Sequence, residues 1–253
     1  MPSKNLAIIT GASRGLGRSL AHQLLQPGLR LLCISRQADS ELEALASKAG
    51  TELTQWQQDL AEPVVAAQRL SDWLAGFEAD EFEHALLINN AGTVGNPKPL
   101  SVARAGDLSV ALRVGLEAPM LLSSAFLAAT GSWSARRKVL NISSGLGRNA
   151  MASQAPYCAA KAGMDHFSRA VALEEARLSN GARIVSLAPG VIDTDMQVQL
   201  READPAGFPD RGIFENLKAG GKLDSPDAAA AKVLAYLARE DYGSKPVADV
   251  RDA

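Results

Sequence analysis

The stretch LAIITGASRGLG, residues 6–17, decides the fold of this chain, because a short apolar run leads directly into a turn with three glycines. The run predicts a buried strand over Leu6–Thr10, and the residues from Gly15 onward predict a helix. Without side chains at Gly11, Gly15 and Gly17, backbone N–H groups and the positive helix end can approach a pyrophosphate. A tight strand-to-helix connection with no ligand is the alternative interpretation of this turn.

Apolar runs of strand length alternate with longer segments of helical period along the rest of the chain, which is typical of βαβ units. The predicted strands are Leu6–Thr10, Leu29–Ser35, Glu52–Gln57, Ala85–Asn89, Lys138–Ile142, Arg183–Ala188 and Val247–Val250. The predicted helices are Gly15–Gln26, Ser40–Ala49, Pro63–Phe77, Asp107–Thr130, Pro156–Leu178 and Pro226–Arg239, with Ser40, Asp107 and Ser225 as N-terminal signals. We therefore expect one domain over residues 1–253, a single-domain α/β Rossmann fold with a doubly wound seven-stranded parallel sheet flanked by helices.

One stretch, residues 194–222, departs from this alternation. It holds two prolines, four glycines and scattered apolar residues among charges. Long excursions of this kind in compact domains are commonly lids or binding elements, so we expect it to carry short helices and to contact the substrate.

The composition of the 253 residues, with 47% hydrophobic side chains, 21% charged ones and a formal net charge of -2, is that of an ordinary globular protein. Lys and Arg are scattered, so no nucleic-acid partner is expected. The run Leu6–Ile9 is too short for a secretory signal, and no segment has the uninterrupted apolar length of a membrane span. Two cysteines and three isolated histidines offer no disulfide framework or metal site. A cytoplasmic location is expected.

Tyr157 and Lys161 stand four residues apart, thirteen and seventeen residues after Ser144. At this spacing the phenol and the ammonium share one helix face, so the cation can favour the phenolate and lower the tyrosine pKa from about 10 toward working pH. In isolation such a pair is more often a structural Tyr beside a surface Lys. Beside the glycine turn and Ser144, the pattern indicates a hydride-transfer site.

Arg36 follows the second predicted strand, where a dinucleotide fold meets the adenosine ribose. An acidic residue there binds the 2′-hydroxyl of NAD, whereas Arg suits the 2′-phosphate of NADP. Arg14 in the glycine turn can clamp the same phosphate. The two arginines favour NADP(H). Asp59 and the run Asn89–Gly92 lie at the carboxyl ends of later strands, where ligands bind in open α/β sheets.

Five motifs, in this order and spacing, resemble the short-chain dehydrogenase/reductase family over essentially the whole chain. They are TGASRGLG (10–17), NNAG (89–92), NISS (141–144), YCAAK (157–161) and Pro189-Gly190. Three further segments, Val191–Gln197, Ala172–Glu175 and Asp241–Asp249, are most similar to the sepiapterin reductases and the bacterial benzil reductases within that family.

The resemblance implies that Tyr157 is the general acid of ketone reduction, that Ser144 positions the carbonyl oxygen, and that Lys161 binds the nicotinamide ribose and lowers the tyrosine pKa. Thr194 would bind the carboxamide, or serve as the N-cap of a short helix, or both. The cofactor would contact Gly11, Ser13, Arg14, Gly15, Leu16, Gly17, Arg36, Asp59, Leu60, Asn90, Ala91, Gly92, Tyr157, Lys161, Pro189, Gly190, Ile192 and Thr194.

Gly115 is a departure from the family pattern, because it stands where the family generally has an asparagine that holds a water in the proton path to the lysine. With glycine at this position, either an extra water fills the vacated space and completes the relay, or the relay is damaged. We expect the water-filled relay, since Ser144, Tyr157 and Lys161 remain. On this view, Gly115→Asn leaves kcat unchanged or lower and stabilises the helix.

These observations predict an NADP(H)-dependent carbonyl reductase of a small ketone or diketone. A pterin, an aromatic diketone and an aliphatic ketone all stay open as substrates. The apolar residues Leu146, Met151 and Phe214 suit contact with a hydrophobic substrate and equally suit ordinary core packing. The alternatives are an NADP(H)-binding redox sensor with little turnover and an NAD-linked alcohol dehydrogenase. The long helices Asp107–Thr130 and Pro156–Leu178 are apolar around much of their circumference, so a homodimer or homotetramer built on them is expected.

Overall fold

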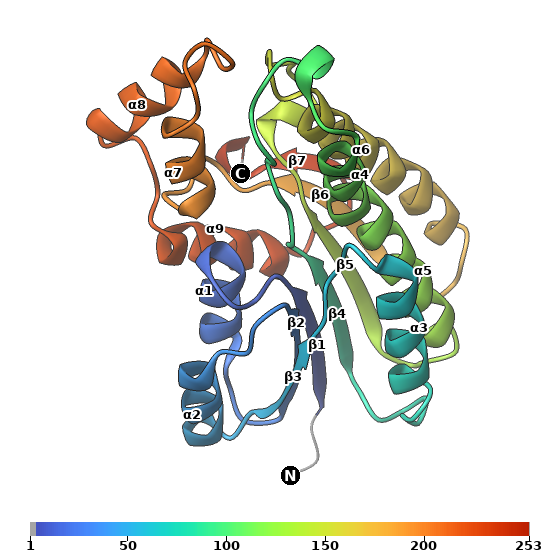
Figure 1. The fold of residues 1–253 in the computed structure, drawn as a ribbon. Coiled ribbons are helices and arrows are strands. Elements are labelled where there is room, and N and C mark those ends of the chain that lie inside the picture. Colours follow the sequence, from blue (N-terminus) through green and yellow to red (C-terminus); the bar gives the residue numbers. More distant parts are fainter. Residues whose placement is uncertain (1–3, 253) are drawn as a thin grey trace.

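The computed structural model describes residues 4–252, and all seven of its strands form one parallel sheet in the order β3-β2-β1-β4-β5-β6-β7 (Figure 1). The strands are β1 Asn5–Thr10, β2 Leu29–Ser35, β3 Glu52–Gln57, β4 His84–Asn89, β5 Arg136–Ile142, β6 Arg183–Ala188 and β7 Val247–Asp249. Strand order reverses direction beside β1, which pairs with β2 on one side and β4 on the other. Crevices for ligands form at such a switch point, outside the carboxyl ends of the strands.

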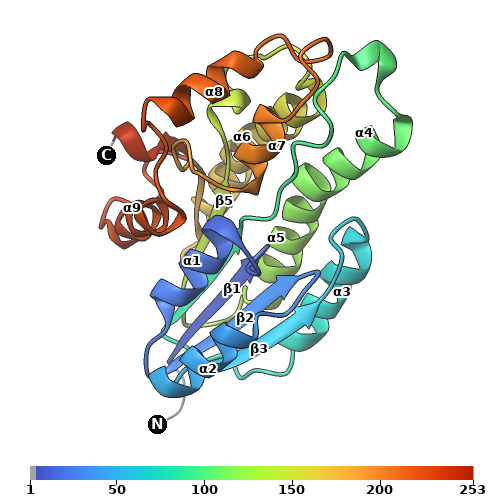
Figure 2. The ribbon, with the colours of Figure 1, turned by 60° about the vertical axis from the view of Figure 1, so that its left-hand side comes forward.

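Helices cover both faces of the sheet, with α1, α2 and α9 on one face and α3 to α6 on the other (Figures 1 and 2). Their bounds are α1 Gly15–Leu24, α2 Ser40–Ala49, α3 Pro63–Leu74, α4 Ala105–Leu112, α5 Ala118–Ala129, α6 Ala155–Glu175, α7 Asp195–Arg201, α8 Arg211–Ala219 and α9 Pro226–Ala238. Short turns of other helix types are η1 Leu100–Val102, η2 Arg113–Glu117, η3 Gly145–Gly147 and η4 Val250–Asp252. Helices α7 and α8 stand away from the sheet and make up most of the excursion over residues 194–222.

Two apolar layers, one on each face of the sheet, hold the helices in place. The layer under α3 and α5 includes Leu70, Leu122 and Phe126, all fully buried, and the layer under α1 and α9 includes Leu20 and Val233. Because both faces of the central strands are covered, those strands are apolar along their whole length instead of alternating. The predicted doubly wound Rossmann fold is confirmed.

The predicted strands and helices are present, with three local corrections. Asp39, and not Ser40, caps α2, because the Asp39 carboxylate accepts hydrogen bonds from the N–H groups of Glu41 and Leu42 at 3.0 and 3.2 Å. The predicted start at Asp107 is wrong, since α4 begins at Ala105. Ser225 caps α9 as predicted, with its hydroxyl 3.1 Å from the N–H of Ala228.

The third correction concerns the predicted helix Asp107–Thr130, which is divided by one π-helical turn, η2, between α4 and α5. Taken together, α4, η2 and α5 span Ala105–Ala129, a helical segment long and apolar enough to cross a membrane by length and composition alone, with a mean hydropathy of 1.4. The sequence analysis expected no segment of that apolar length. Its buried residues Ala118, Leu122 and Phe126 pack in the layer under α3. The apolar composition of this helix therefore has an explanation in its place on the sheet.

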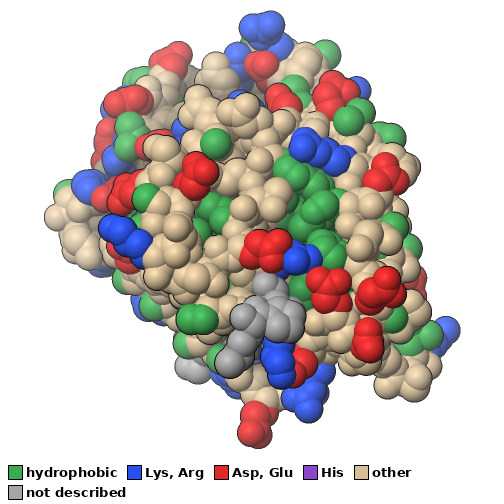
Figure 3. Space-filling view, turned by 90° about the horizontal axis from the view of Figure 1, so that it is seen from below, with side chains coloured by type: hydrophobic (Ala, Val, Ile, Leu, Met, Phe, Trp, Pro, Cys, Tyr) green, Lys and Arg blue, Asp and Glu red, His purple; other side chains and the backbone are tan. Residues whose placement is uncertain are grey.

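Charged side chains of both signs are interspersed on the face seen from below in Figure 3, with apolar side chains between them. This face carries no extended field of one sign, in keeping with the formal net charge of -2.

Candidate active site

A cavity of about 1120 Å³ opens along the carboxyl ends of the strands. The glycine turn after β1, the ends of β4, β5 and β6, the start of α6, and helix α7 all contribute to its lining. It brings together all of the predicted cofactor-contacting and catalytic residues except Gly17. Segments that are far apart in the sequence thus meet at one site.

The glycine turn is built by close approach of backbone to backbone. A Cβ atom on Gly17 would lie 2.2 Å from the carbonyl oxygen of Gly11 and 2.4 Å from the side-chain amide of Asn90. Gly11 itself has φ +68°, in the left-handed region. Gly17 therefore sets the distance between α1 and the turn, and it is not part of the cavity lining.

The Asn90 side chain supports the turn from behind. Its amide nitrogen donates to the carbonyl oxygens of Thr10 at 2.9 Å and Gly11 at 3.3 Å. The Thr10 hydroxyl in turn accepts from the N–H groups of Asn90 and Ala91 at 2.9 and 3.0 Å. The end of β4 is thereby tied to the end of β1, so the predicted residue Asn90 shapes the floor of the cavity with its side chain.

The N-terminus of α1 is open toward the cavity. Its cap residue, Arg14, makes no side-chain capping bond, and the first turn holds no acidic residue. The first N–H groups of the helix are thus left for an anion, and the helix dipole favours one there. Together with the glycine turn, which a Cβ would fill, this arrangement fits a cofactor pyrophosphate.

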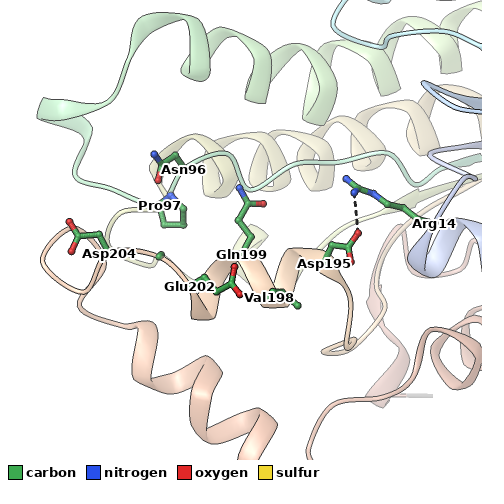
Figure 4. Close-up of a pocket in the computed structure, with 9 residues that line it drawn as sticks. Arg14, Asn96, Pro97, Asp195, Val198, Gln199, Glu202 and Asp204 are labelled. Atoms are coloured by element: carbon green, nitrogen blue, oxygen red, sulfur yellow. Dashed lines mark hydrogen bonds and ion pairs between the residues drawn. The ribbon is translucent and has the colours of Figure 1, made fainter.

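The two arginines predicted to bind a 2′-phosphate stand in different situations. Arg36 is exposed, lines the cavity, and has no hydrogen bond or ion pair to any residue within 4–252. Arg14 instead donates to the Asp195 carboxylate at 3.0 Å, and both residues line one end of a smaller pocket of about 510 Å³ between α7 and the loop after β4 (Figure 4). Both side chains of this pair are about two-thirds exposed or more, so the ion pair is weak and can be exchanged.

Ser144 and Tyr157 meet at the carboxyl end of β5. Ser144 is the N-cap of η3, and its hydroxyl oxygen accepts from the N–H of Leu146 at 3.2 Å. The phenol of Tyr157, in the first turn of α6, lies near this hydroxyl. Burial raises the pKa of Tyr157, and the nearby Ser144 hydroxyl lowers it by less. The phenol is therefore protonated at neutral pH, as a proton donor must be.

Lys161, one turn further along α6, is 3% exposed, and its ammonium donates to the carbonyl oxygen of Ile142 at 2.6 Å. Its Nζ lies 5.7 Å from the centre of the Tyr157 ring. Burial lowers the pKa of Lys161 to about 8. The pKa of Tyr157 lies above its usual value in this structure, because the effect of burial outweighs the lowering by Ser144. The lowering of the tyrosine pKa by Lys161 that the sequence suggests stays a prediction.

Thr194 holds the N-cap position of α7, as one of the two predicted uses requires. Its hydroxyl makes no capping bond and lies 3.5 Å from the carbonyl oxygen of Ile192, so the other predicted use, binding a carboxamide in the cavity, stays available. Its methyl group lies 3.2 Å from where a Cβ on Gly15 would be. Helix α7 thus begins against the glycine turn.

An apolar wall flanks Tyr157 on the side of the excursion over residues 194–222. Its buried members are Val94, Leu200, Ala203, Phe208 and Phe214, with Leu146, Met151, Met196 and Leu217 packed against them. The rings of Phe208 and Phe214 lie 5.7 Å apart, centre to centre. The excursion therefore contributes apolar side chains next to Tyr157. Leu146, Met151 and Phe214 line the cavity and also pack in this cluster, so substrate contact and core packing both stay available for them.

A family model described as short chain dehydrogenase matches residues 5–205, which contain the glycine turn, Ser144, Tyr157 and Lys161. The chain belongs to the short-chain dehydrogenase family. It is therefore an oxidoreductase of a family that binds nicotinamide cofactors, and the resemblance inferred from the motifs is confirmed.

Similar proteins come from both of the subgroups that the sequence resembles. A benzil reductase ((S)-benzoin forming) of Bacillus cereus is 36% identical over 235 residues, covering 93% of this chain and 94% of the relative. A sepiapterin reductase of Xenopus tropicalis is 33% identical over 254 residues, covering 94% and 93%. Among solved structures, a short-chain dehydrogenase/reductase from Burkholderia vietnamiensis is 34% identical with a TM-score of 0.67, covering 100% of this chain and 99% of that one.

Gly115, the departure from the family pattern, lies buried in the π-helical turn η2. A Cβ there would lie 3.0 Å from the Cβ of Ala160, the residue before Lys161. Such turns inside α-helices are frequently found at functional sites. Helices η2 and α6 approach closely at this point, so a side chain at position 115 requires Ala160 to shift by a few tenths of an ångström.

We expect Gly115→Asn to destabilise the protein by about 1–3 kcal/mol, because the new side chain must displace Ala160. The expected sign is opposite to the helix stabilisation expected from the loss of glycine alone. The displacement also moves the helix between Tyr157 and Lys161, so kcat falls. Urea unfolding and steady-state kinetics measure the two effects.

Gly106→Asn is the matched control, since Gly106 lies in the same long helix with nothing within 4 Å of its would-be Cβ. It should leave stability within about 0.5 kcal/mol of the original protein. Equal stability of the two variants would show that position 115 has room for a side chain. A several-fold rise in kcat for Gly115→Asn would show that the missing amide limits proton delivery.

Proposed function

We propose that this protein is an NADPH-dependent carbonyl reductase that reduces a small apolar ketone or diketone, such as a benzil-like aromatic diketone. The observation that carries the proposal is the apolar part of the cavity lining near Tyr157, to which Leu200 and Phe214 of the excursion contribute. Apolar walls with a few placed polar groups are typical of small-molecule sites. The names of the relatives, benzil reductase and sepiapterin reductase, support a carbonyl substrate.

The residues of this chain fit a nicotinamide dinucleotide. The open N-terminus of α1 and the glycine turn would hold its pyrophosphate, Asp59 and Leu60 would border its adenine end, and Thr194 would face its carboxamide. When bound, this cofactor supplies the hydride that attacks the carbonyl carbon. A cavity of about 1120 Å³ leaves room for a small substrate beside it.

Tyr157 provides the proton. As negative charge develops on the carbonyl oxygen, the phenol O–H transfers its proton to that oxygen, and the Ser144 hydroxyl holds the oxygen in place by a hydrogen bond. The Lys161 ammonium stabilises the phenolate that remains. The raised pKa of Tyr157 makes the phenol a reluctant acid before substrate binds, so the nearby ammonium matters most while the proton is leaving.

Tyr157→Phe should lower kcat by at least about a hundredfold with benzil or another aromatic diketone, because the ring still packs but the proton is gone. NADPH binding, followed by cofactor fluorescence, should change little. Ser144→Ala should lower kcat less, since it removes a hydrogen bond and leaves the acid.

Retention of more than about a tenth of the rate in the Tyr157→Phe variant would contradict the assignment of the acid. Tight NADPH binding by the original protein without turnover of any ketone or diketone would support the alternative of a redox-sensing binding protein.

Preference for NADPH is proposed to rest on Arg36, which is free to meet a 2′-phosphate. The nearest acidic side chain on the same loop, Asp39, is bound to the Arg18 side chain at 2.5 Å and caps α2, so its carboxylate is occupied. Arg14 is shared with Asp195 and would join Arg36 after giving up that pair. Two guanidiniums near the ribose favour a phosphate over a hydroxyl.

Arg36→Asp should raise the NADPH KM by about tenfold or more and leave the NADH KM unchanged or lower, because a charge-assisted bond is replaced by repulsion. Asp195→Asn is the opposite test, since it frees Arg14 and should lower the NADPH KM alone. Initial rates with both cofactors measure the effect. Equal use of NADPH and NADH by the original protein would favour the NAD-linked alcohol dehydrogenase.

We propose further that the protein is a cytoplasmic homodimer or homotetramer built on the helices of one sheet face. Val110 and Leu112 of α4, Met120 of α5 and Leu173 of α6 are large apolar residues between 39% and 68% exposed. Exposed apolar patches of this kind mark protein contacts, and a second copy of the same face would cover both.

Light scattering at micromolar concentration should report a dimer or tetramer, and Met120→Lys with Leu173→Lys should shift it toward the monomer. Val64→Lys is the control, because Val64 is 66% exposed on α3, outside this patch. A monomeric original protein would rule out the assembly.

A further inference from the structure

A second buried charge lies one turn beyond the proposed catalytic lysine. Asp165, on α6, is 2% exposed. Its Oδ1 accepts hydrogen bonds from the hydroxyls of Ser143 and Ser186, each at 2.6 Å. Its Oδ2 lies 3.2 Å from the guanidinium of Arg148. Two hydroxyl donors and one guanidinium thus surround this buried carboxylate.

The partners of Asp165 come from three elements that border the site. Ser143 directly precedes Ser144 at the end of β5, Ser186 belongs to β6, and Arg148 follows η3. A Cβ on Gly147 would lie 2.9 Å from Oδ2 of Asp165 and 3.0 Å from the carbonyl oxygen of Lys161. The turn that carries Ser144 is therefore packed directly on this carboxylate.

The spacing from Lys161 to Asp165 is four residues, so both side chains lie on the same face of α6. Burial lowers the pKa of Lys161, and the charge of Asp165 raises it. Other charged groups nearby are Arg148 and, beyond it, Asp249 of β7, 3.9 Å from Arg148 and paired with Arg251. Of these charged groups, Asp165 is the anion that shares a face of α6 with Lys161.

We propose that Asp165 is a positioning residue of the reductase, which keeps the Lys161 ammonium charged at neutral pH and fixes the Ser144 turn through Ser143. The proposal rests on the proposed function for its kinetic consequence. Its electrostatic part concerns Lys161 alone and can be tested without turnover.

The direction of the effect follows from the charges. A cation loses a stabilising neighbour when Asp165 becomes neutral, so the pKa of Lys161 falls. Activity that needs the ammonium is then lost at lower pH on the alkaline side. Removal of Arg148 has the opposite sign, because a repelling cation disappears and the carboxylate faces Lys161 uncompensated.

The first experiment is titration of the Lys161 side chain by NMR in protein labelled at lysine, with Lys161→Met to assign the signal. The original protein should titrate near pH 8. Asp165→Asn should titrate about one pH unit lower or more, and Arg148→Met should titrate higher. Identical Lys161 titration in the original protein and Asp165→Asn would overturn the proposal, whatever the substrate is.

The second experiment is the pH profile of kcat and kcat/KM for diketone reduction by the same variants. For Asp165→Asn, the alkaline limb should move down by about one unit, a tenfold loss at the upper end, with a smaller loss near pH 6. Ser186→Ala removes one hydrogen bond and keeps the charge, so its limb should stay in place. Asp165→Glu should restore part of the shift.

The opposite shifts of Asp165→Asn and Arg148→Met separate positioning from general damage, because misfolding would lower activity at every pH in both variants. Equal losses across the pH range would overturn the proposal. Lys161 shifts as expected together with no turnover by the original protein would leave the electrostatic assignment standing and refute the proposed function instead.

Discussion

The close approach of α1 to the turn that precedes it is the constraint on which the rest of the structure depends. At Gly17 there is no space for even one carbon atom, since the Gly11 carbonyl and the Asn90 amide already occupy it. This contact joins the end of β1 to the end of β4 at the point where strand order reverses. The cavity forms there because the strands that follow β1 are added on opposite sides of it, with β2 on one side and β4 on the other.

Helix α6 is attached to the sheet by two kinds of contact. Its later turns pack through apolar residues such as Val171, whereas its earlier turns are held by polar groups at strand ends. Lys161 donates to Ile142, and Ser168 accepts from Asn141 at 2.9 Å. Buried charges are costly unless paired and hydrogen-bonded, so the strand ends that satisfy them also define where the helix can sit. The same contacts orient the groups that the reaction requires.

Two positions that the sequence analysis assigned to the site, Gly115 and Arg14, also lie at contacts between elements. Gly115 lacks the family side chain, and Ala160 of the facing helix lies where the first atom of that side chain would meet it. Arg14, a predicted phosphate ligand, holds the start of α7 through Asp195. Arg14 is a predicted ligand and Gly115 marks a missing family side chain, but each residue also sets how closely two elements approach.

Much of this protein was determined by its sequence alone. Apolar runs alternating with helical segments gave the strand and helix order, because each pattern has its own period, and the glycine turn with Ser144, Tyr157 and Lys161 predicted the family. Local spacing places groups only along one element, so it found Tyr157 and Lys161 on one helix face. It could also have found Asp165, four residues further on.

Tertiary structure alone decided what surrounds each group. Burial raises the pKa of Tyr157, and this desolvation depends on atoms from elements distant in the chain. The packing of Gly17, the contact at Gly115 and the convergence of Ser143, Ser186 and Arg148 on Asp165 likewise arise between elements. A sequence pattern does not contain these distances between elements, because they are set by how α1 and α6 pack on the sheet.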